Sequence, residues 1–204
     1  MIIIYDYGVG NNVSIKNIIN RIGLSAEITS EISQVEQASF CIIPGVGSFD
    51  TCISSFLRQN SSEVLLKRIS GGLKTLGICV GMQMLFDKSE EGELEGLKLI
   101  PGEVKRFNSF DKDFKEKIPH MTWNYVSKVD DDKTYKGFDE DPKFYFVHSY
   151  HAVCSDEYVS GYSEYGHRFP ASVRKDNIYG AQFHPEKSHT YGMKFLKNFF
   201  ADET

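Results

Sequence analysis

Two short stretches of this sequence combine residue types that could carry out nucleophilic catalysis. The first, Gly77-Ile78-Cys79-Val80-Gly81, places a cysteine between two glycines in a G-x-C-x-G pattern. The same pattern with serine is the nucleophile elbow, a tight strand-to-helix turn that exposes a strained nucleophile above a sheet. A sulfur at the start of that helix lies near the positive end of the helix dipole, which favours the thiolate. The pattern therefore predicts a nucleophilic Cys79, in preference to a small apolar cysteine in a turn.

The second stretch, Gln182-Phe183-His184-Pro185-Glu186, offers a base and a carboxylate. His184 and Glu186 are two residues apart, so an extended segment directs both side chains to the same side. A nucleophilic cysteine needs a base that takes its proton and returns it to the leaving group, and a carboxylate that fixes the tautomer of that base. The alternatives are a surface histidine beside a solvated glutamate, or half of a metal site that lacks a third ligand at a defined spacing. With Cys79, this stretch predicts a Cys-His-Glu triad whose members meet in space.

The first half of the chain alternates between patterns typical of strands and of helices. Strands are expected at 2–5, 26–29, 39–43 and 73–78, and helices at 13–22, 50–57 and 62–69. In the first helix, isoleucines recur at the spacing i, i+3, i+4, i+7 and form one apolar stripe. This rhythm predicts a parallel sheet with helices on both faces. Because ligands collect at the carboxyl ends of parallel strands, the loops at 6–12 and 44–48 are expected beside the elbow at 77–81.

The second half consists of short aromatic or β-branched segments separated by turn residues. Antiparallel strands that extend or flank the first sheet are expected at 104–107, 122–126, 144–150, 158–163, 171–174 and 178–183. A final amphipathic helix is expected at 191–200, and the acidic run at 90–95 is interpreted as an exposed loop without chemistry. The predicted fold class is therefore α/β, a single domain over residues 1–204. Its central, mainly parallel sheet is flanked by helices, with additional antiparallel strands in the C-terminal half.

The composition excludes several classes of function. The 204 residues suffice for one α/β domain, and a net charge of -5 gives no reason to expect nucleic acid or an anionic membrane as a partner. No apolar run approaches the length of a transmembrane helix, and the start Met1-Ile2-Ile3-Ile4-Tyr5-Asp6 lacks the basic region of a signal peptide. The cysteines at 41, 52, 79 and 154 show no C-x-x-C pair or metal-ligand spacing. We therefore expect a reducing, cytoplasmic compartment, and neither a metal nor a cofactor.

The first loop contains Gly8-Val9-Gly10, which matches the beginning of a dinucleotide-binding fingerprint. The full fingerprint, G-x-G-x-x-G, requires a third glycine where this chain has Val13. The acidic residue expected about twenty positions further on has no convincing candidate at the end of the second strand. Nucleotide binding is therefore not expected.

Taken together, the motifs resemble those of the class I glutamine amidotransferases, a family of Cys-His-Glu glutaminases. This resemblance rests on the elbow, followed by Met82-Gln83, and on the stretch at 182–186. It narrows to the glutaminase subunits of imidazole glycerol phosphate synthase through further motifs that occur in the family's order over essentially the whole chain. These are Pro44-Gly45-Val46-Gly47-Ser48-Phe49, Pro119-His120-Met121-Thr122-Trp123-Asn124, Phe146-Val147-His148-Ser149-Tyr150 and Pro185-Glu186-Lys187-Ser188.

The resemblance implies a reaction and a set of residue roles. Cys79 attacks the carboxamide carbon of L-glutamine, His184 gives a proton to the departing ammonia, and Glu186 orients His184. Water then hydrolyses the glutamyl thioester. The backbone N–H groups of Val46 and Val80 would form the oxyanion hole, and an elbow supplies the second of these donors directly. The implied glutamine-binding residues are Gly47, Gln83, Ser149 and Tyr150.

The resemblance also implies a partner protein. Ammonia is protonated and lost in neutral water, so a glutaminase is useful when it is docked on the enzyme that consumes ammonia. The family's partner is a (β/α)8-barrel cyclase, and the heterodimer makes imidazole glycerol phosphate and AICAR in histidine biosynthesis. The residues on partner-facing motifs are Asn11, Asn12, Met121, Trp123 and Lys187. Trp123 is the sole tryptophan and fits an interface as well as a core.

Two departures from the family pattern leave the ammonia acceptor open. Thr122 replaces the usual glycine of P-H-M-G-W-N, and Val80 stands where leucine is more usual. One alternative is a paralogous glutaminase that supplies ammonia for nucleotide-sugar or surface-polysaccharide amidation. A stand-alone γ-glutamyl cysteine hydrolase and a non-catalytic binding subunit are the others, and the complete triad disfavours the last.

Overall fold

The largest feature of the molecule is a mixed sheet of eight strands. The computed structural model describes residues 1–108, 114–129 and 132–201. The strand order is β2-β1-β3-β4-β13-β12-β11-β8, and neighbours from β2 to β13 run parallel as the α/β rhythm predicted. The strands are β1 (Ile2–Tyr5), β2 (Ala26–Thr29), β3 (Phe40–Ile43), β4 (Lys74–Ile78), β8 (Ser127–Lys128), β11 (Val159–Tyr165), β12 (His167–Lys175) and β13 (Ile178–Ala181). The predicted α/β class is therefore confirmed.

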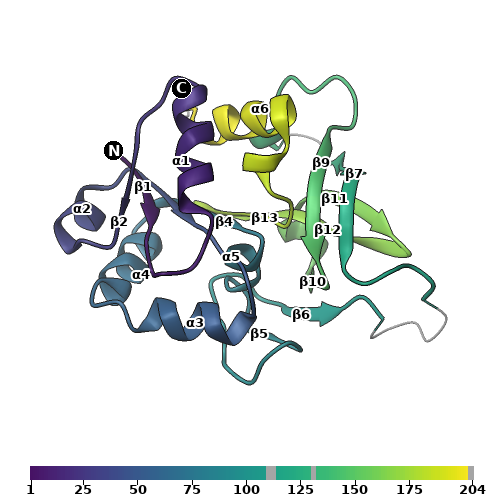
Figure 1. Cartoon of the computed structure of the whole chain (residues 1–204), viewed down its shortest axis with the longest axis horizontal. Coiled ribbons are helices and arrows are strands. Elements are labelled where there is room, and N and C mark those ends of the chain that lie inside the picture. Colours follow the sequence, from purple (N-terminus) through teal and green to yellow (C-terminus); the bar gives the residue numbers. More distant parts are fainter. Residues whose placement is uncertain (109–113, 130–131, 202–204) are drawn as a thin grey trace.

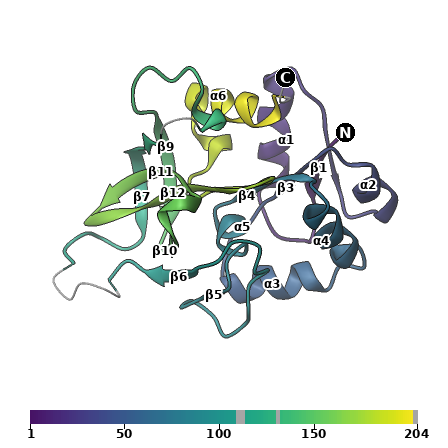
Figure 2. The same ribbon diagram turned by 180° about the vertical axis from the view of Figure 1, so that it is seen from behind.

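Helices cover both faces of this sheet (Figure 1, Figure 2). The helices α1 (Asn12–Arg21) and α6 (His189–Phe200) lie on one face, and α3 (Phe49–Leu57) and α4 (Ser62–Ser70) lie on the other. The buried residues of α1 are isoleucines of the predicted apolar stripe, Ile15, Ile18 and Ile19. Within the described ranges, none of the helices is both long and apolar enough to span a membrane.

Two smaller sheets accompany the large one, and nearly all of their strands come from the second half of the chain. One has the order β10-β6-β5 and the other pairs β7 with β9. Their strands are β5 (Lys88–Ser89), β6 (Glu103–Arg106), β7 (His120–Tyr125), β9 (Lys143–His148) and β10 (Tyr150–Val153), and single turns of 3-10 helix lie at η1 (Lys133–Tyr135), η2 (Asp156–Tyr158) and η3 (Pro185–Lys187).

Strand β13 shows that one part of the topology prediction was wrong. The segment was expected to be antiparallel, yet β13 runs parallel to β4 on one side, with Gly180 opposite Gly77. It is antiparallel to β12 on its other side. The parallel pairing places the chain that leads into His184 directly beside the chain that leads into Cys79. The topology itself therefore joins the two motifs that are distant in sequence.

Three further predictions about elements differ from the structure. The helix that an elbow predicts after Cys79 is only one turn long, α5 (Val80–Gln83), and it is followed by a turn in which Leu85 N–H donates to the carbonyl of Met82 at 3.0 Å. The strand expected at 144–150 is interrupted at Ser149, so β9 and β10 lie in different sheets. The helix α2 (Ile32–Gln37) was not predicted, because it buries only Val35 and has no apolar stripe.

An aromatic cluster packs strand β9 and the segment after β13 against helix α6. The rings of Phe144 and Phe183 stack with centroids 3.8 Å apart and an interplanar angle of 14°. Phe195 of α6 packs edge-on against both, at 6.0 and 5.1 Å. All three side chains are buried, and each contributes about 2 kcal/mol through removal of apolar surface from water. Because Phe183 precedes His184, the cluster also fixes where the imidazole enters the site.

Candidate active site

Cys79 occupies a strained turn between β4 and α5. Its backbone has φ 56° and ψ −114°, a conformation that costs a non-glycine residue of order 1–3 kcal/mol. A Cβ atom at Gly81 would lie 2.1 Å from the carbonyl oxygen of Ile43, and one at Gly77 would lie 2.5 Å from that of Gly81. Both glycines are therefore required by backbone contacts, as a nucleophile elbow demands.

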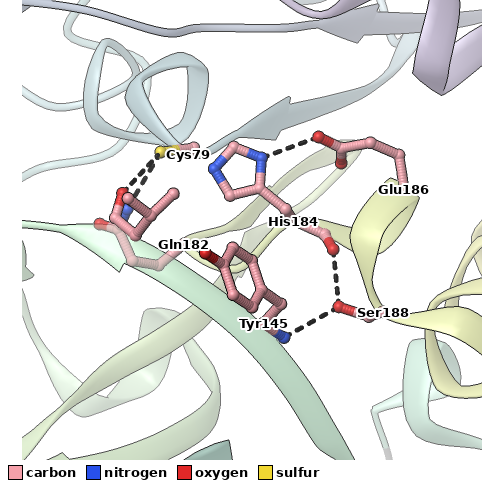
Figure 3. A network of polar contacts seen from close by, with 7 residues as sticks. Cys79, Tyr145, Gln182, His184, Glu186 and Ser188 are labelled. Atoms are coloured by element: carbon pink, nitrogen blue, oxygen red, sulfur yellow. Dashed lines mark hydrogen bonds and ion pairs between the residues drawn. The ribbon is translucent and has the colours of Figure 1, made fainter. Parts of the chain in front are cut away.

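The imidazole of His184 lies beside Cys79 and is oriented by Glu186 (Figure 3). Its Nδ1 lies 2.8 Å from Oε1 of Glu186, and the two side chains are 3% and 1% exposed. Its Nε2 is buried, has no hydrogen-bond partner among the described residues, and lies on the ring edge that faces the sulfur. The structure thus brings together the three residues in which the sequence predicted a triad.

Two forces act in opposite directions on the pKa of His184. Burial lowers it, but the neighbouring Cys79 and Glu186 outweigh burial and raise the pKa to about 10. A raised pKa favours the imidazolium when a thiolate lies opposite. The imidazole beside Cys79 is therefore able to hold a proton near neutral pH, as the partner of a cysteine nucleophile must.

Hydrogen bonds to Tyr145 and Ser188 also fix the backbone of His184. Its N–H donates to the carbonyl of Tyr145 at 2.9 Å. The Ser188 hydroxyl donates to the His184 carbonyl at 2.6 Å and accepts from the Tyr145 N–H at 3.0 Å (Figure 3). Strand β9 and the turn after η3 therefore hold the histidine in place with few degrees of freedom.

The sulfur and the imidazole open into a cavity of about 290 Å³. Every residue that the sequence assigned to the oxyanion hole or to glutamine binding lines this cavity, namely Val46, Gly47, Val80, Gln83, Ser149 and Tyr150. The remaining lining residues are Glu91, Pro119, Val147, His148 and Lys187. The cavity therefore gathers residues from both halves of the chain around the nucleophile.

The loop Pro44–Gly47 rests directly on the elbow. A Cβ atom at Gly45 would lie 2.2 Å from the backbone nitrogen of Gly81, so the two segments are in backbone contact. Gly47 has φ +90°, which a residue with a side chain adopts only at a cost. The loop is thus held close enough to Cys79 for its peptide groups to face a bound substrate.

Two buried side chains anchor this loop from behind. The Tyr7 hydroxyl donates to the carbonyl of Pro44, and the Cys52 thiol donates to the carbonyl of Val46 at 3.4 Å. Burial raises the pKa of the Cys52 thiol to about 11, so it remains a donor near neutral pH. The anchors lie on either side of the Gly45–Val46 peptide, whose N–H was predicted to enter the oxyanion hole.

The side-chain amide of Gln83 is already engaged by the protein. Its Nε2 donates to the carbonyl of Tyr150 at 3.1 Å and to Oε1 of Gln182 at 3.0 Å. These two bonds use both amide protons. What Gln83 offers a glutamine substrate is therefore its carbonyl oxygen, together with the shape of the cavity wall.

Glu91 is a functional candidate that the sequence interpretation missed. It was assigned to an exposed acidic loop, yet it lines the cavity and accepts the N–H of Phe49 at 2.8 Å. Burial raises the pKa of its carboxyl group. A run of acidic residues is typical of a solvated loop, so only the tertiary fold distinguishes Glu91 from its neighbours.

The residues assigned to a partner interface have different environments. Met121 is 60% exposed, whereas Trp123 is half-buried and stacks on His189 with an interplanar angle of 1°. Lys187 is exposed at the rim of the cavity. Asn11 and Asn12 are partly exposed at the start of α1, and the amide of Asn12 donates to Asp6 at 3.2 Å. Their role in docking stays a prediction.

The described residues contain no group of three or more histidine, cysteine or acidic side chains that could hold a metal ion.

Comparison with known proteins places these features in a family. The family model Glutamine amidotransferase class-I matches residues 3–203. The chain is 44% identical over 201 residues to imidazole glycerol phosphate synthase subunit HisH 2 of Methanococcus maripaludis, covering 98% of each chain. It is 40% identical over 203 residues to subunit HisH of Syntrophotalea carbinolica, again covering 98% of each. The solved structure of PurLQS from Thermotoga maritima shares the fold, with a TM-score of 0.72 at 17% identity over 97% of this chain and 96% of that one.

Proposed function

The chain belongs to the class I glutamine amidotransferases, and from this premise we propose that it is the glutaminase subunit of an imidazole glycerol phosphate synthase. It hydrolyses L-glutamine to glutamate and ammonia and delivers the ammonia to a cyclase subunit in histidine biosynthesis. Relatives that carry this subunit name match it at 40% and 44% identity over nearly their full length. The observation that carries the reaction is the strained Cys79 facing the buried His184–Glu186 pair in one cavity.

The first half of the reaction forms a thioester. The sulfur of Cys79 attacks the carboxamide carbon of glutamine, and the carbonyl oxygen becomes an oxyanion. The N–H groups of Val46 and Val80 stabilise that oxyanion, at about 3 kcal/mol for each well-placed donor. The intermediate collapses as the C–N bond breaks, and the proton held on His184 leaves with the ammonia.

The second half of the reaction releases glutamate. Water attacks the thioester carbon and gives a proton to the imidazole of His184, while the same oxyanion hole acts again. Breaking the C–S bond returns the thiolate to Cys79 and leaves the proton on His184. The Glu186 carboxylate accepts a hydrogen bond from Nδ1–H of His184 throughout, which keeps Nε2 directed at the reacting atoms.

Binding of the amino-acid end of glutamine follows from the charges in the cavity wall. Glu91 places a carboxylate in the lining, which complements the substrate ammonium group. Ser149 and Tyr150 line the cavity at the break between β9 and β10. The oxyanion loop and this break thus lie on two sides of the same substrate.

The partner in this proposal is a (β/α)8-barrel cyclase that accepts ammonia directly from the glutaminase. The exposed Met121, the half-buried Trp123 and Lys187 at the rim of the cavity support docking near the point of ammonia release. Aromatic and methionine side chains are enriched at protein interfaces. Thr122 lies between Met121 and Trp123, so the one departure in this motif falls on the same strand.

A partner-dependence assay tests the proposal. We expect slow glutamine hydrolysis by the chain alone and an increase of about a hundredfold or more when the cyclase and its nucleotide ligand are added, because closing an active site in the productive conformation is worth several kcal/mol. Equal turnover with and without the cyclase, together with cleavage of γ-glutamyl peptides, would instead identify a stand-alone hydrolase. Stimulation by a sugar-modifying synthetase and not by the cyclase would identify a paralogous glutaminase.

A further inference from the structure

The sulfur of Cys79 accepts a hydrogen bond that the catalytic triad does not use. Nε2 of Gln182 lies 3.8 Å from Sγ of Cys79, and Gln182 is fully buried (Figure 3). Oε1 of Gln182 accepts from Nε2 of Gln83 at 3.0 Å. That bond fixes the orientation of the Gln182 amide, because its oxygen must face Gln83 and its N–H group must therefore face the sulfur.

The carbonyl of Tyr150 connects this pair of amides to a pair of histidines. It accepts from Nε2 of Gln83 at 3.1 Å and from Nδ1 of His148 at 2.7 Å. A carbonyl oxygen only accepts, so the proton of His148 is on Nδ1 and its Nε2 is an acceptor. The donor to that Nε2 is Nδ1 of His120, at 3.0 Å.

The orientations of His120 and Asn124, the residues of this hydrogen-bond series most distant from Cys79, are fixed in the same way. With its proton on Nδ1, neutral His120 accepts at Nε2 from Nδ2 of Asn124 at 3.3 Å. The amide of Asn124 is oriented by two backbone groups, because its oxygen accepts from Tyr125 N–H at 2.8 Å and its nitrogen donates to the Glu164 carbonyl at 2.7 Å. Every proton in the series therefore has one consistent position.

Both histidines are kept neutral by their surroundings. His120 is fully buried and His148 nearly so. Burial lowers the pKa of His120 to about 4 and lowers that of His148 well below its ordinary value. The single set of tautomers that satisfies the hydrogen bonds is thus the set expected over the neutral pH range.

We propose that Asn124, His120, His148, Gln83 and Gln182 form one positioning unit, the amide–imidazole chain, which fixes the glutamine-binding turn at Tyr150 and directs an N–H donor at the Cys79 sulfur. The role rests on the proposed glutaminase function. His120 and Asn124 alternate along β7 with Met121 and Trp123. These two members of the amide–imidazole chain and the predicted docking residues therefore occupy opposite faces of one strand. The amide–imidazole chain therefore links the strand of the predicted docking residues to the carbonyl of Tyr150.

Two substitutions of His120 test this role at a distance from the sulfur. His120→Phe keeps an aromatic ring where His120 stacks on Phe146 and Tyr165, at 4.9 and 4.1 Å, but removes the donor to His148. His120→Asn keeps an N–H group at the position of Nδ1 and serves as the matched control. With the cyclase present, we expect His120→Phe to raise KM for glutamine about fivefold with kcat changed less than twofold, and His120→Asn to stay within about twofold of the wild type, because one buried hydrogen bond is at stake.

Nitrogen-15 NMR of the histidine rings provides a readout independent of activity. The wild-type protein should show His148 protonated at Nδ1. His120→Phe should keep that tautomer, because the Tyr150 carbonyl still accepts from Nδ1, and should shift the resonance of Nε2, which loses its donor. Protonation of wild-type His148 at Nε2, or equal KM values for His120→Phe and the wild type, would overturn the positioning role. Equal damage in His120→Asn and His120→Phe would overturn it as well. If His120→Phe fails to fold, the His148 tautomer of the wild type decides alone, and an inactive wild type would refute the glutaminase proposal without affecting that result.

Discussion

The elbow region and the histidine-rich region place their functional groups by different means. In the elbow region, formed by β4, α5 and the loop Pro44–Gly47, backbone contacts dominate, and Gly45, Gly77 and Gly81 are needed because a Cβ atom has no room there. In the histidine-rich region, formed by β7, β9 and β10, side-chain hydrogen bonds and ring stacking hold the cavity wall. The first region presents the nucleophile and the second shapes the substrate cavity.

This difference predicts which kind of substitution each region tolerates least. Backbone contacts resist any added atom, so the elbow region should tolerate almost no substitution of Gly45, Gly77 or Gly81. A hydrogen-bonded side-chain network resists the loss of a donor or a change of protonation, so the histidine-rich region should respond to chemistry more than to volume. Substitutions and pH changes can therefore separate the two.

The largest expected effect is that of Gly81→Ala in the elbow region. The new Cβ would lie 2.1 Å from the carbonyl oxygen of Ile43, which is backbone and cannot move aside. We expect the free energy of unfolding to fall by about 4 kcal/mol or more, measured by urea denaturation. Gly23→Ala is the matched control, since Gly23 has φ +88° with no atom within 4 Å of the new Cβ and should cost about 1–2 kcal/mol. Equal losses in the two variants would contradict the backbone account of the elbow.

A smaller effect is expected when acid is added to the histidine-rich region. The pKa of His120 and that of His151 are both lowered to about 4 by burial. Between pH 4 and the unfolded value near 6.5, the unfolded chain therefore binds more protons than the folded one, so stability falls as the pH drops through this window. We expect a loss of roughly 2–3 kcal/mol for each histidine, measured as the free energy of urea unfolding from pH 7 to pH 4.

His120→Asn separates this contribution from that of the carboxylates. The variant keeps the donor to His148 but does not titrate, so its stability should depend less on pH than that of the wild type by roughly the contribution of one histidine. Identical pH dependence in the two proteins would show that His120 is not held neutral in the folded state. The claim that protonation destabilises the histidine-rich region would then be wrong for His120.

The nucleophile turn and the parallel part of the large sheet were predictable because local rules determine them. Two glycines at a fixed spacing, apolar strands and a helical stripe predicted β1, β3, β4, α1 and the position of Cys79. The family resemblance is confirmed by the comparisons, and its motifs alone assigned roles to Val46 and Gln83, whereas residue chemistry had already indicated His184. Those roles in catalysis and binding remain predictions.

The histidine-rich region was less predictable because tertiary pairing assembles it. His120, His148 and His151 come from β7, β9 and β10, and no spacing in the sequence indicates that they meet. The parallel pairing of β13 with β4 was missed because its apolar pattern does not reveal the direction of its neighbours. Glu91 was missed because its burial depends on the start of α3 rather than on its own acidic run.

Labelling with a glutamine-like chloroketone, followed by peptide mass spectrometry, tests the central claim most directly. The claim is that Cys79 is the nucleophile, activated by the buried His184–Glu186 pair. We predict a single adduct on Cys79, formed in competition with glutamine and slowed at least a hundredfold in His184→Gln, with Cys41, Cys52 and Cys154 unmodified. An adduct on another cysteine, or glutamine hydrolysis that survives Cys79→Ala, would contradict it.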